Sequence, residues 1–553
     1  MLENYQKTEM AGSSDVSGPT SATVAYLQAY FVTIATILGT GILGLPVTLI
    51  KSGLYPFLIS FVIDAVMQSV LIHFFVDLLQ KACAVQMGNL QEESVPLQEL
   101  EDEETELGSD SNGDVVMKEF EEPSTSGARP VSPNLHLLGT IFLGCGCQQM
   151  FDVLIILQFI ALLICYALAG SEAYAQVIGI DHFYVIPVFV WVLTFAIVFA
   201  LQLIQPIISI LTFLKGSVLL ATTLVTFYVG VVLGRSGNND FSYIAAPFLM
   251  GTVAIGGTIN TMPFTFERIG YKKDEIKNYR LAVQLGLWTC VLLNILWCWS
   301  VLDIVPQTVL DACQGEIAHS KSMMVADGPA SPNLCFGELS LESAKINGEI
   351  STVPMTKILA RDYPTYTWVA VLVQVFIMVS ITVSYLTIGG ALHHTLNGVM
   401  QSVLVKRGLD LERFTAPQTC CNKLKILSTC VSLLGFIAVF AVAMANPQGF
   451  VDILEKFASL TLNSQAGIFV FLMLLASRRL KGVSVPAPMA GWFHHLVWTI
   501  PIFFNGAVVM DIYSIIRDII DPQHLVPIVL NSTLIAAGEN ADDDADADYD
   551  AGS

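Results

Sequence analysis

Apolar runs of membrane-crossing length recur along this chain of 553 residues. A helix needs about 20 apolar residues to cross a bilayer. The runs are continuous rather than alternating, so they predict membrane helices and not a membrane β-barrel. The fold class expected is therefore an all-α integral membrane protein with eleven spans. We place these spans at 22–50, 54–79, 137–169, 184–204, 206–233, 241–267, 279–302, 366–392, 427–446, 449–476 and 491–517.

The composition agrees with a membrane protein. Hydrophobic residues make up 54% of the chain and charged residues 13%, whereas soluble domains carry about 25% charged residues. This excludes an ordinary soluble enzyme, a nucleic-acid-binding protein, a coiled coil and a disordered chain. Most of the net charge of −21 comes from two acidic stretches, 91–129 and 537–553. The charge therefore says nothing about a substrate.

Lysine and arginine set the expected orientation, because cytosolic loops of membrane proteins are enriched in them. The bases cluster in segments 268–280, 406–425 and 478–481. This predicts a cytosolic N-terminus and an extracellular or luminal C-terminus, in the plasma membrane or in a lysosomal or vacuolar membrane. The expected organisation is a polar tail (1–21), helices 1 and 2 (22–79), an acidic cytosolic loop (80–133), helices 3 to 7 (134–302), an outer loop (303–365), helices 8 to 11 (366–517) and an acidic outer tail (518–553).

Two modifications are expected on the outer side. Cys313 and Cys335 are the only cysteines of the outer loop. Because that loop faces an oxidising compartment, we predict a disulfide bond between them. Asn531, Ser532 and Thr533 form a glycosylation sequon in the outer tail, although a lone sequon also arises by chance.

The first span contains a cluster of helix-breaking residues. Residues 36–46 read Thr-Ile-Leu-Gly-Thr-Gly-Ile-Leu-Gly-Leu-Pro, and glycine and proline weaken or break a helix. Inside a membrane, freed backbone groups are tolerated only within protein or beside a water-filled cavity. Freed amides at the start of a half-helix attract an anion. We therefore predict that the carboxylate of a substrate binds at Gly39, Thr40, Gly41, Ile42 and Gly44.

Two other interpretations of these glycines deserve comparison. Gly39, Gly41 and Gly44 match the dinucleotide-binding pattern G-x-G-x-x-G, but no strand precedes them and no ribose-binding acid follows. The remaining alternative is that the glycines only allow close packing between helices.

A second break is expected in span six, where residues 251–263 again combine glycines with a proline. Gly256, Gly257, Thr258 and Asn260 are predicted to bind the ammonium group of the same substrate. The two broken spans are five spans apart and run in opposite directions. That arrangement predicts an inverted five-plus-five repeat with a binding site at the midplane of the membrane.

The segment Gly39 to Pro46, followed by Lys51, Ser52 and Gly53, resembles the first-helix signature of the amino acid/auxin permease family within the amino acid-polyamine-organocation superfamily. The similarity is greatest to its proton-coupled and vacuolar branch. The resemblance implies the leucine-transporter-like fold and transport of small, mostly neutral amino acids, without a cofactor. Sodium-dependent members carry an asparagine four residues before the motif, where this chain has Ala35. A proton is therefore expected in preference to sodium as the coupling ion.

Polar residues inside spans are costly and are candidates for a site. In some proton-coupled relatives of this fold, a lysine on the fifth helix replaces a sodium ion between helices one and eight. The resemblance gives that role to Lys215, which can alternatively extend to the membrane surface. Ser380, Ser384 and Thr387 share one helical face and can hold an ion or bond to their own helix. Asp64, Gln68 and Asp152 are further embedded polar residues whose partners the sequence does not reveal.

These features together predict a secondary active transporter rather than an enzyme, with Tyr166 closing the outer side of the substrate site. One alternative is an amino-acid sensor that signals to a protein partner through loop 80–133. Another is a membrane enzyme that uses His393 or His394. No nucleic-acid partner is expected, and the lipid bilayer is the surrounding phase.

Overall fold

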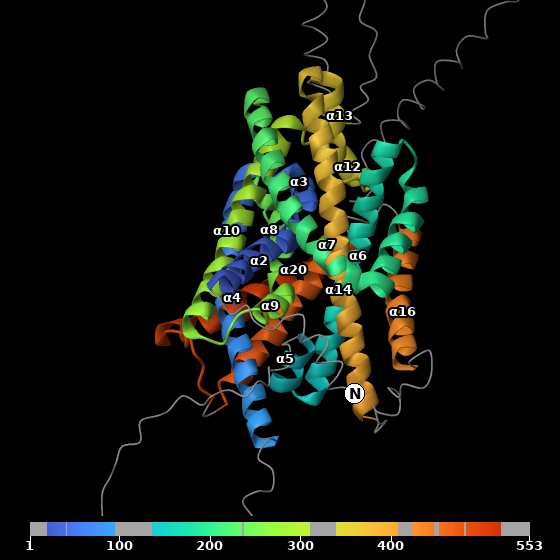
Figure 1. Ribbon diagram of the computed structural model, residues 1–553. Helices are drawn as coiled ribbons and strands as arrows, with labels where there is room; N and C mark the ends of the chain where they lie inside the picture. Colours follow the sequence, from blue (N-terminus) through green and yellow to red (C-terminus); the bar gives the residue numbers. More distant parts are fainter. Residues whose placement is uncertain are drawn as a thin grey trace, which may run out of the picture.

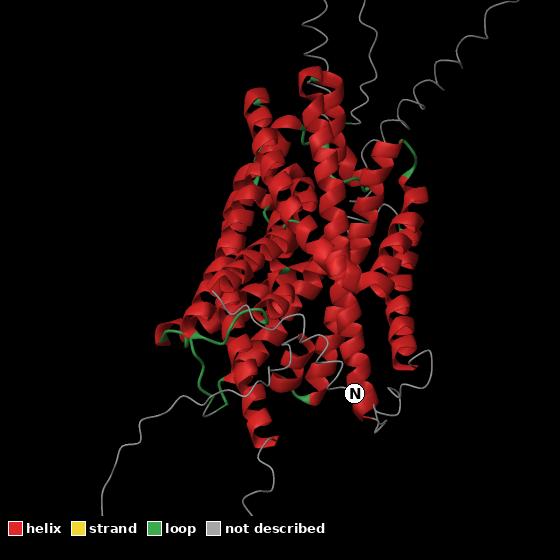
Figure 2. Cartoon of the chain, in the orientation of Figure 1, coloured by secondary structure: helices red, strands yellow, loops and turns green. Residues whose placement is uncertain are grey.

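The computed structural model describes residues 19–39, 41–93, 135–234, 237–309, 339–406, 423–446, 449, 453–480 and 483–520. Every regular element within these ranges is a helix, as Figure 2 shows. Thr40, Cys313, Cys335 and Asn531 lie outside the described residues. The predicted disulfide bond and glycosylation site therefore stay predictions.

Ten of the eleven predicted spans have the length and apolar character of a membrane span in the described residues. Nine helices are long and apolar enough to cross a membrane, and the bent pair α2 and α3 makes a tenth span. The short helices α8 and α9 follow each other at the position predicted for span six. The spans are α2 (Pro19–Ile37) with α3 (Gly41–Ser52), α4 (Leu54–Glu93), α6 (Cys145–Ile178), α7 (His182–Leu233, two spans), α8 (Ala245–Gly256) with α9 (Thr258–Phe266), α10 (Lys273–Ile304), α14 (Thr367–Lys406), α16 (Lys423–Ala445), the run from η3 (Ile453–Ala458) through α18 (Ser459–Ser464) and η4 (Gln465–Val470) to α19 (Phe471–Ser477), and η5 (Gly491–Trp498) with α20 (Thr499–Ile520).

Several predicted boundaries were wrong. Helix α4 continues to Glu93 and not to residue 79, because the polar residues after the apolar run are good helix formers. Lys81 and Asp77, one helical turn apart, form an ion pair of 2.8 Å that supports this extension. The predicted third span begins instead with a separate short helix, α5 (Leu135–Phe142), and α6 starts only at Cys145.

The helices pack in two groups, which Figure 1 shows side by side. One group contains α2, α3, α4, α8, α9 and α10, so it includes both interrupted spans. The other contains α6, α14 and α16. Helix α7 contacts both groups and kinks at Ala200, whose backbone leaves the helical region (φ −124°, ψ 17°). Helix α2 of the first group also contacts α7 and α14. The interrupted first span therefore lies where the two helix groups meet, which is the position needed for a site between moving parts.

The two ends of the bundle differ. Helices α12 (Leu341–Asn347) and α13 (Thr352–Asp362) cover one end, which we call the α13 end, and α5 lies at the opposite end, the α5 end (Figure 1). Helix α14 runs between the two ends. Next to α13, the Ser351 hydroxyl donates a hydrogen bond of 3.1 Å to the carbonyl oxygen of Leu43. This bond connects the start of α13 directly to helix α3 of the interrupted first span.

Candidate functional site

The first span is interrupted at the predicted glycines. Helix α2 ends at Ile37, α3 begins at Gly41, and their axes differ by 42°. The position of the proline differs from the prediction, because Pro46 lies inside α3 and not at the break. A proline there removes one backbone hydrogen bond and crowds the carbonyl group four residues earlier, yet α3 continues through it to Ser52. The chain therefore turns where glycines remove side-chain constraints, and the first amides of α3 have no partner within that helix.

The second interruption is smaller than the sequence suggests. Only Gly257 separates α8 from α9, and its backbone stays near the helical region (φ −65°, ψ −8°). The backbone N–H of Asn260 donates to the Gly257 carbonyl at 3.1 Å, three residues back, which is a tighter turn than that of an α-helix. The Gln68 side chain donates to the Gly256 carbonyl at 3.5 Å. The prediction of an unwound segment across 251–263 was therefore too broad.

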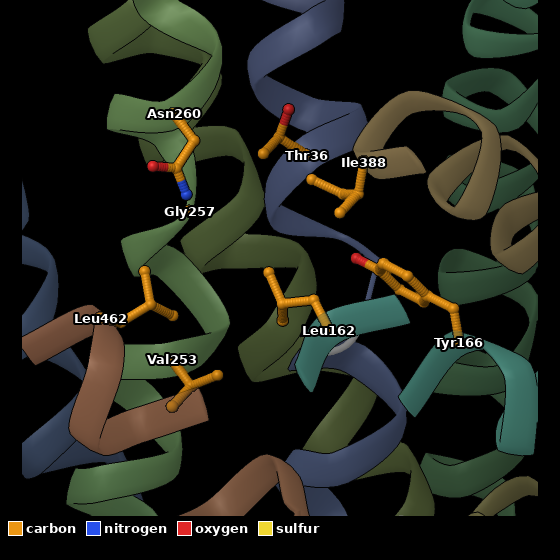
Figure 3. Close-up of a pocket in the computed structure, with 8 residues that line it drawn as sticks. All are labelled: Thr36, Leu162, Tyr166, Val253, Gly257, Asn260, Ile388 and Leu462. Carbon is orange, nitrogen blue, oxygen red and sulfur yellow. The ribbon is translucent and has the colours of Figure 1, made fainter. Parts of the chain in front are cut away.

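A cavity lies beside both interruptions, as Figure 3 shows. It has about 290 Å³ of space outside the atoms, including the part that opens to solvent. The cavity itself has a volume of only about 10 Å³, which is room for about one water molecule. Six helices, α2, α6, α8, α9, α14 and α18, contribute its walls. The lining residues are Thr36, Leu162, Tyr166, Val253, Gly257, Asn260, Ile388 and Leu462.

Three of the predicted substrate-binding residues, Tyr166, Gly257 and Asn260, line this cavity. Gly39 lies next to it, because a Cβ atom there would overlap the Tyr166 hydroxyl and come within 2.9 Å of the Ser384 hydroxyl oxygen. In Figure 3 the Tyr166 side chain reaches toward the interrupted first span. Gly39 thus permits a close approach between the break and α6.

The other predicted substrate-binding residues make packing contacts instead. A Cβ atom at Gly41 would overlap Ala254, and one at Gly44 would come within 2.7 Å of the Leu454 side chain. At Gly256 it would be 3.7 Å from Leu462. Ile42 and Thr258 are fully buried, and the Thr258 hydroxyl bonds to its own helix. Close helix packing, the alternative reading of the glycines, accounts for Gly41 and Gly44.

Lys215 reaches the break from α7. Its ammonium nitrogen Nζ donates to the carbonyl oxygen of Ala35 at 2.8 Å and to the hydroxyl oxygen of Ser384 at 2.7 Å. The residue is only 1% exposed, so it does not extend to the membrane surface. Lys215 therefore connects the first, fifth and eighth spans at one point. Within the described part of the chain, the Lys215 ammonium group donates hydrogen bonds only to neutral oxygens.

The three hydroxyls of span eight have different partners. Ser384 accepts the Lys215 bond, and Ser380 donates to the carbonyl oxygen of Leu38 at 3.3 Å. Thr387 instead donates to Val383 of its own helix at 2.8 Å. Two of the three predicted ion-coupling hydroxyls therefore face the break in the first span, and the third does not contact it.

Sequence reasoning identified Ser459 and Asn463 as polar residues of the tenth span, but it missed Gln465 and the irregular turns of this span. The span contains two π-helical turns, η3 and η4, which flank α18, and π-turns often occur at functional sites. From η4, the Gln465 amide donates to the Asn260 side-chain oxygen at 3.0 Å. Thr36 was missed as well; its hydroxyl donates to Thr261 at 3.3 Å. No sequence signal marks a π-turn, although Gln465 directly follows the polar residues Asn463 and Ser464 inside a predicted span.

A buried polar cluster connects the tenth span with its neighbours. The Ser459 hydroxyl donates to Asp511 of α20 at 2.9 Å. The Asn463 amide donates to Ser459 and to Thr252 of α8, both at 3.0 Å, and to Asp511 at 3.4 Å. All four side chains are buried. This cluster fixes α18 and α20 against the helix that carries the second interruption.

We expect Asp511→Ala to destabilise the protein, because it removes the acceptor from two buried donors. Leaving buried polar groups unpaired costs about 1–3 kcal/mol. Thermal unfolding in detergent would measure this as a lower Tm. Asp518→Ala is the matched control on the same helix, since Asp518 pairs with Lys456 at 2.9 Å in a partly exposed position. Such pairs contribute at most about 1 kcal/mol, and an equal loss in both variants would contradict the prediction.

The embedded Asp152 has a partner at the α5 end. Both of its carboxylate oxygens lie 3.0 Å from Nδ1 of His136, whose Nε2 lies 2.6 Å from the Ser402 hydroxyl. These residues belong to α6, α5 and α14, so the cluster joins three helices.

His393, a candidate for the enzyme alternative, bonds through Nδ1 to Ser432 and through Nε2 to Asn397. Both of its ring nitrogens are therefore occupied by other side chains.

No family model matches the chain, and no curated protein sequence matches it. A solved structure of the manganese transporter of Eremococcus coleocola aligns with 95% of this chain and 94% of its own, with a TM-score of 0.51 and 13% identity. The chain has the leucine-transporter-like fold. At 13% identity, this alignment shows a shared fold and not a shared substrate. The similar structure is a membrane transporter and not an enzyme.

A second solved structure is that of MHP1, a nucleobase-cation-symport-1 family transporter in a closed conformation with bromovinylhydantoin bound. It aligns with 88% of this chain and 90% of its own, at 12% identity. Its TM-score of 0.48 is too low to support an argument about this chain.

Proposed function

We propose that the protein is a secondary active transporter of small neutral amino acids, coupled to protons through Lys215. The observation that carries this proposal is the position of the Lys215 ammonium group. It is buried between the broken first span and α14, next to Gly39 and the cavity. A lysine can take up and release a proton when its surroundings change, and this one does so where the two helix groups meet.

The residues that line the cavity, and not its volume in this structure, support a small zwitterion as the substrate. Leu162, Val253, Ile388 and Leu462 give the cavity apolar walls, and none of its lining residues is charged. An apolar side chain fits such walls, whereas a charged side chain would remain unpaired there. The first amides of α3 attract a carboxylate, and the Asn260 oxygen together with hydroxyls such as Thr36 can accept from an ammonium group. The resemblance of Gly39 to Pro46 to amino acid/auxin permeases supports the same substrate class.

The coupling follows from the bonds of Lys215. While the nitrogen is protonated, its hydrogen bonds to Ala35 and Ser384 hold α2 against α14. A neutral amine forms weaker hydrogen bonds than an ammonium group. Deprotonation therefore loosens α2, and the helices α2, α3, α8 and α9 can then rock against the other helices, including α4 and α10. Proton release and opening of the cavity are thereby linked.

We also propose the orientation predicted from the basic segments, with the α5 end in the cytosol and the α13 end outside or in a lumen. The acidic loop 80–133 then faces the cytosol, and the glycosylation sequon at Asn531 faces the other side. The plasma membrane and a lysosomal or vacuolar membrane both fit this orientation.

Uptake into proteoliposomes tests the function. We expect pooled radiolabelled neutral amino acids to accumulate when a pH gradient is imposed, and not with a sodium gradient alone. Liposomes without protein and a pool of acidic and basic amino acids are the controls. Binding without flux under both gradients would contradict the transporter proposal and favour a sensor that signals through loop 80–133.

A further inference from the structure

Asp64 is a buried acid near the middle of the second span. It lies ten residues after the start of α4, which corresponds to about 15 Å along the helix axis and thus to half of a bilayer core of about 30 Å. The side chain is 2% exposed, and neither carboxylate oxygen has a hydrogen-bond partner among the described residues.

The Asp64 carboxyl group is closely packed against the backbone of α8. A Cβ atom at Gly251 of α8 would overlap the Asp64 oxygen Oδ2 and come within 3.1 Å of the Phe61 ring. Only a glycine at this position of α8 lets the backbone approach the carboxyl group. Gln68, one turn further along α4, directs its amide to the Gly256 carbonyl and not to Asp64. The carboxyl group therefore lies in the contact between α4 and the first half of the interrupted sixth span.

No charged side chain on the described elements around α4 pairs with Asp64. On α4 itself, His73, Asp77 and Lys81 are nine or more residues away, at least about 13 Å along the axis. Helices α8, α9 and α19 carry no charged residue. On α10, Arg280 lies near Asp77, and the other charged residues are in the first turns (Lys273, Asp274, Glu275 and Lys277) or the last turn (Asp303). Lys51 of α3 lies over the Tyr243 ring, and His136 of α5 pairs with Asp152. On α20, Asp511 accepts from Ser459, and Arg517 and Asp518 take part in ion pairs.

The titratable but uncharged groups nearby are also engaged elsewhere or distant along the chain. Tyr279 of α10 bonds to Met262 and Thr265. Cys290 lies near Lys215 and Ile34. Cys298 is buried in α10, and Tyr55 and Cys83 are nine and nineteen residues from Asp64 on α4. None of these groups supplies a positive charge to the carboxyl group.

We infer that Asp64 is a proton-binding site at the contact between α4 and α8. An ionised carboxylate without partners is very costly in such surroundings, so the packed arrangement requires a proton on Asp64. When α8 moves away, water reaches the carboxyl group, and the proton passes to that water. Loading with a proton thus permits α8 to pack, and loss of the proton favours its separation. This second proton site, distinct from Lys215, rests on the proposed transport function only for its role in gating.

Infrared spectroscopy of the purified protein tests the protonation without any transport measurement. We expect wild type minus Asp64→Asn to show the carbonyl stretch of one protonated carboxylic acid at neutral pH, with a shift in heavy water. Asp77→Asn is the matched control, because Asp77 lies on the same helix and pairs with Lys81 at 2.8 Å; it should lose only a carboxylate band. If Asp64→Asn does not fold, Asp64→Leu supplies the difference spectrum.

A carboxylate band lost in the Asp64 variant would overturn the inference, whether or not the protein transports amino acids. The close approach has a separate test. Gly251→Ala should lower the Tm in the wild-type background and lower it less in an Asp64→Ala background, because the overlapping oxygen is then absent. Equal decreases in both backgrounds would contradict a direct contact between Asp64 and α8.

Discussion

Lys215→Ala is expected to abolish accumulation driven by a pH gradient. The variant removes the two hydrogen bonds that connect Lys215 to Ala35 and Ser384. Hydrogen bonds to charged groups contribute about 1.5–3 kcal/mol each to the stability of the arrangement that they hold. A change of about 1.4 kcal/mol corresponds to a tenfold change in an equilibrium constant. We therefore expect the pH-driven uptake rate in proteoliposomes to fall at least about tenfold, with its pH dependence lost.

Lys51→Ala is the matched control, since Lys51 is an exposed lysine that lies over the Tyr243 ring 5.4 Å from its centre. It should keep both the rate and the pH profile. Exchange of substrate without a gradient separates coupling from binding, and Lys215→Ala should retain part of that exchange. A pH profile like that of the wild type would refute the coupling role of Lys215 while leaving transport itself untouched.

The fold could be predicted from the sequence because lipid imposes simple rules on a chain. Apolar length gave the spans, and the odd separation between two glycine-rich segments gave their opposite directions. Both properties depend on single segments and not on tertiary contacts. The ends of spans were less predictable, as α4 shows, because polar helix formers continue a helix beyond the membrane without any apolar signal.

The site was only partly predictable, for a related reason. Glycines mark where a backbone bends or packs closely, but the sequence does not tell these two uses apart. Gly39 lies at the break and next to Tyr166, whereas Gly41 and Gly44 pack α3 against Ala254 and Leu454. The Ala35 position was informative as an absence: no asparagine is present there, and its backbone carbonyl accepts from Lys215 instead. The contributions of Thr36, Leu462 and Gln465 depend on tertiary geometry that no local pattern reveals.

Gly41→Val is expected to abolish uptake while the protein still inserts into the membrane. A Cβ atom at position 41 would overlap the Ala254 side chain and lie 2.7 Å from the Ala254 Cα atom. Because Cα is backbone, no side-chain rotation relieves the overlap, and α3 and α8 must separate. Overpacking of this kind costs about 1–3 kcal/mol or more, and here the strain falls on both interrupted spans beside the cavity.

Uptake and surface labelling would be measured on the same preparation of Gly41→Val. Gly506→Val is the matched control, because a Cβ atom at Gly506 of α20 meets no other atom within 4 Å; it should transport normally. Gly41→Ala should already impair uptake, since the overlap begins at Cβ, and valine should add to the loss. Normal uptake by Gly41→Val would mean that α3 and α8 do not touch at Ala254 in the working protein, and the position of the cavity between the two interrupted spans would then be wrong.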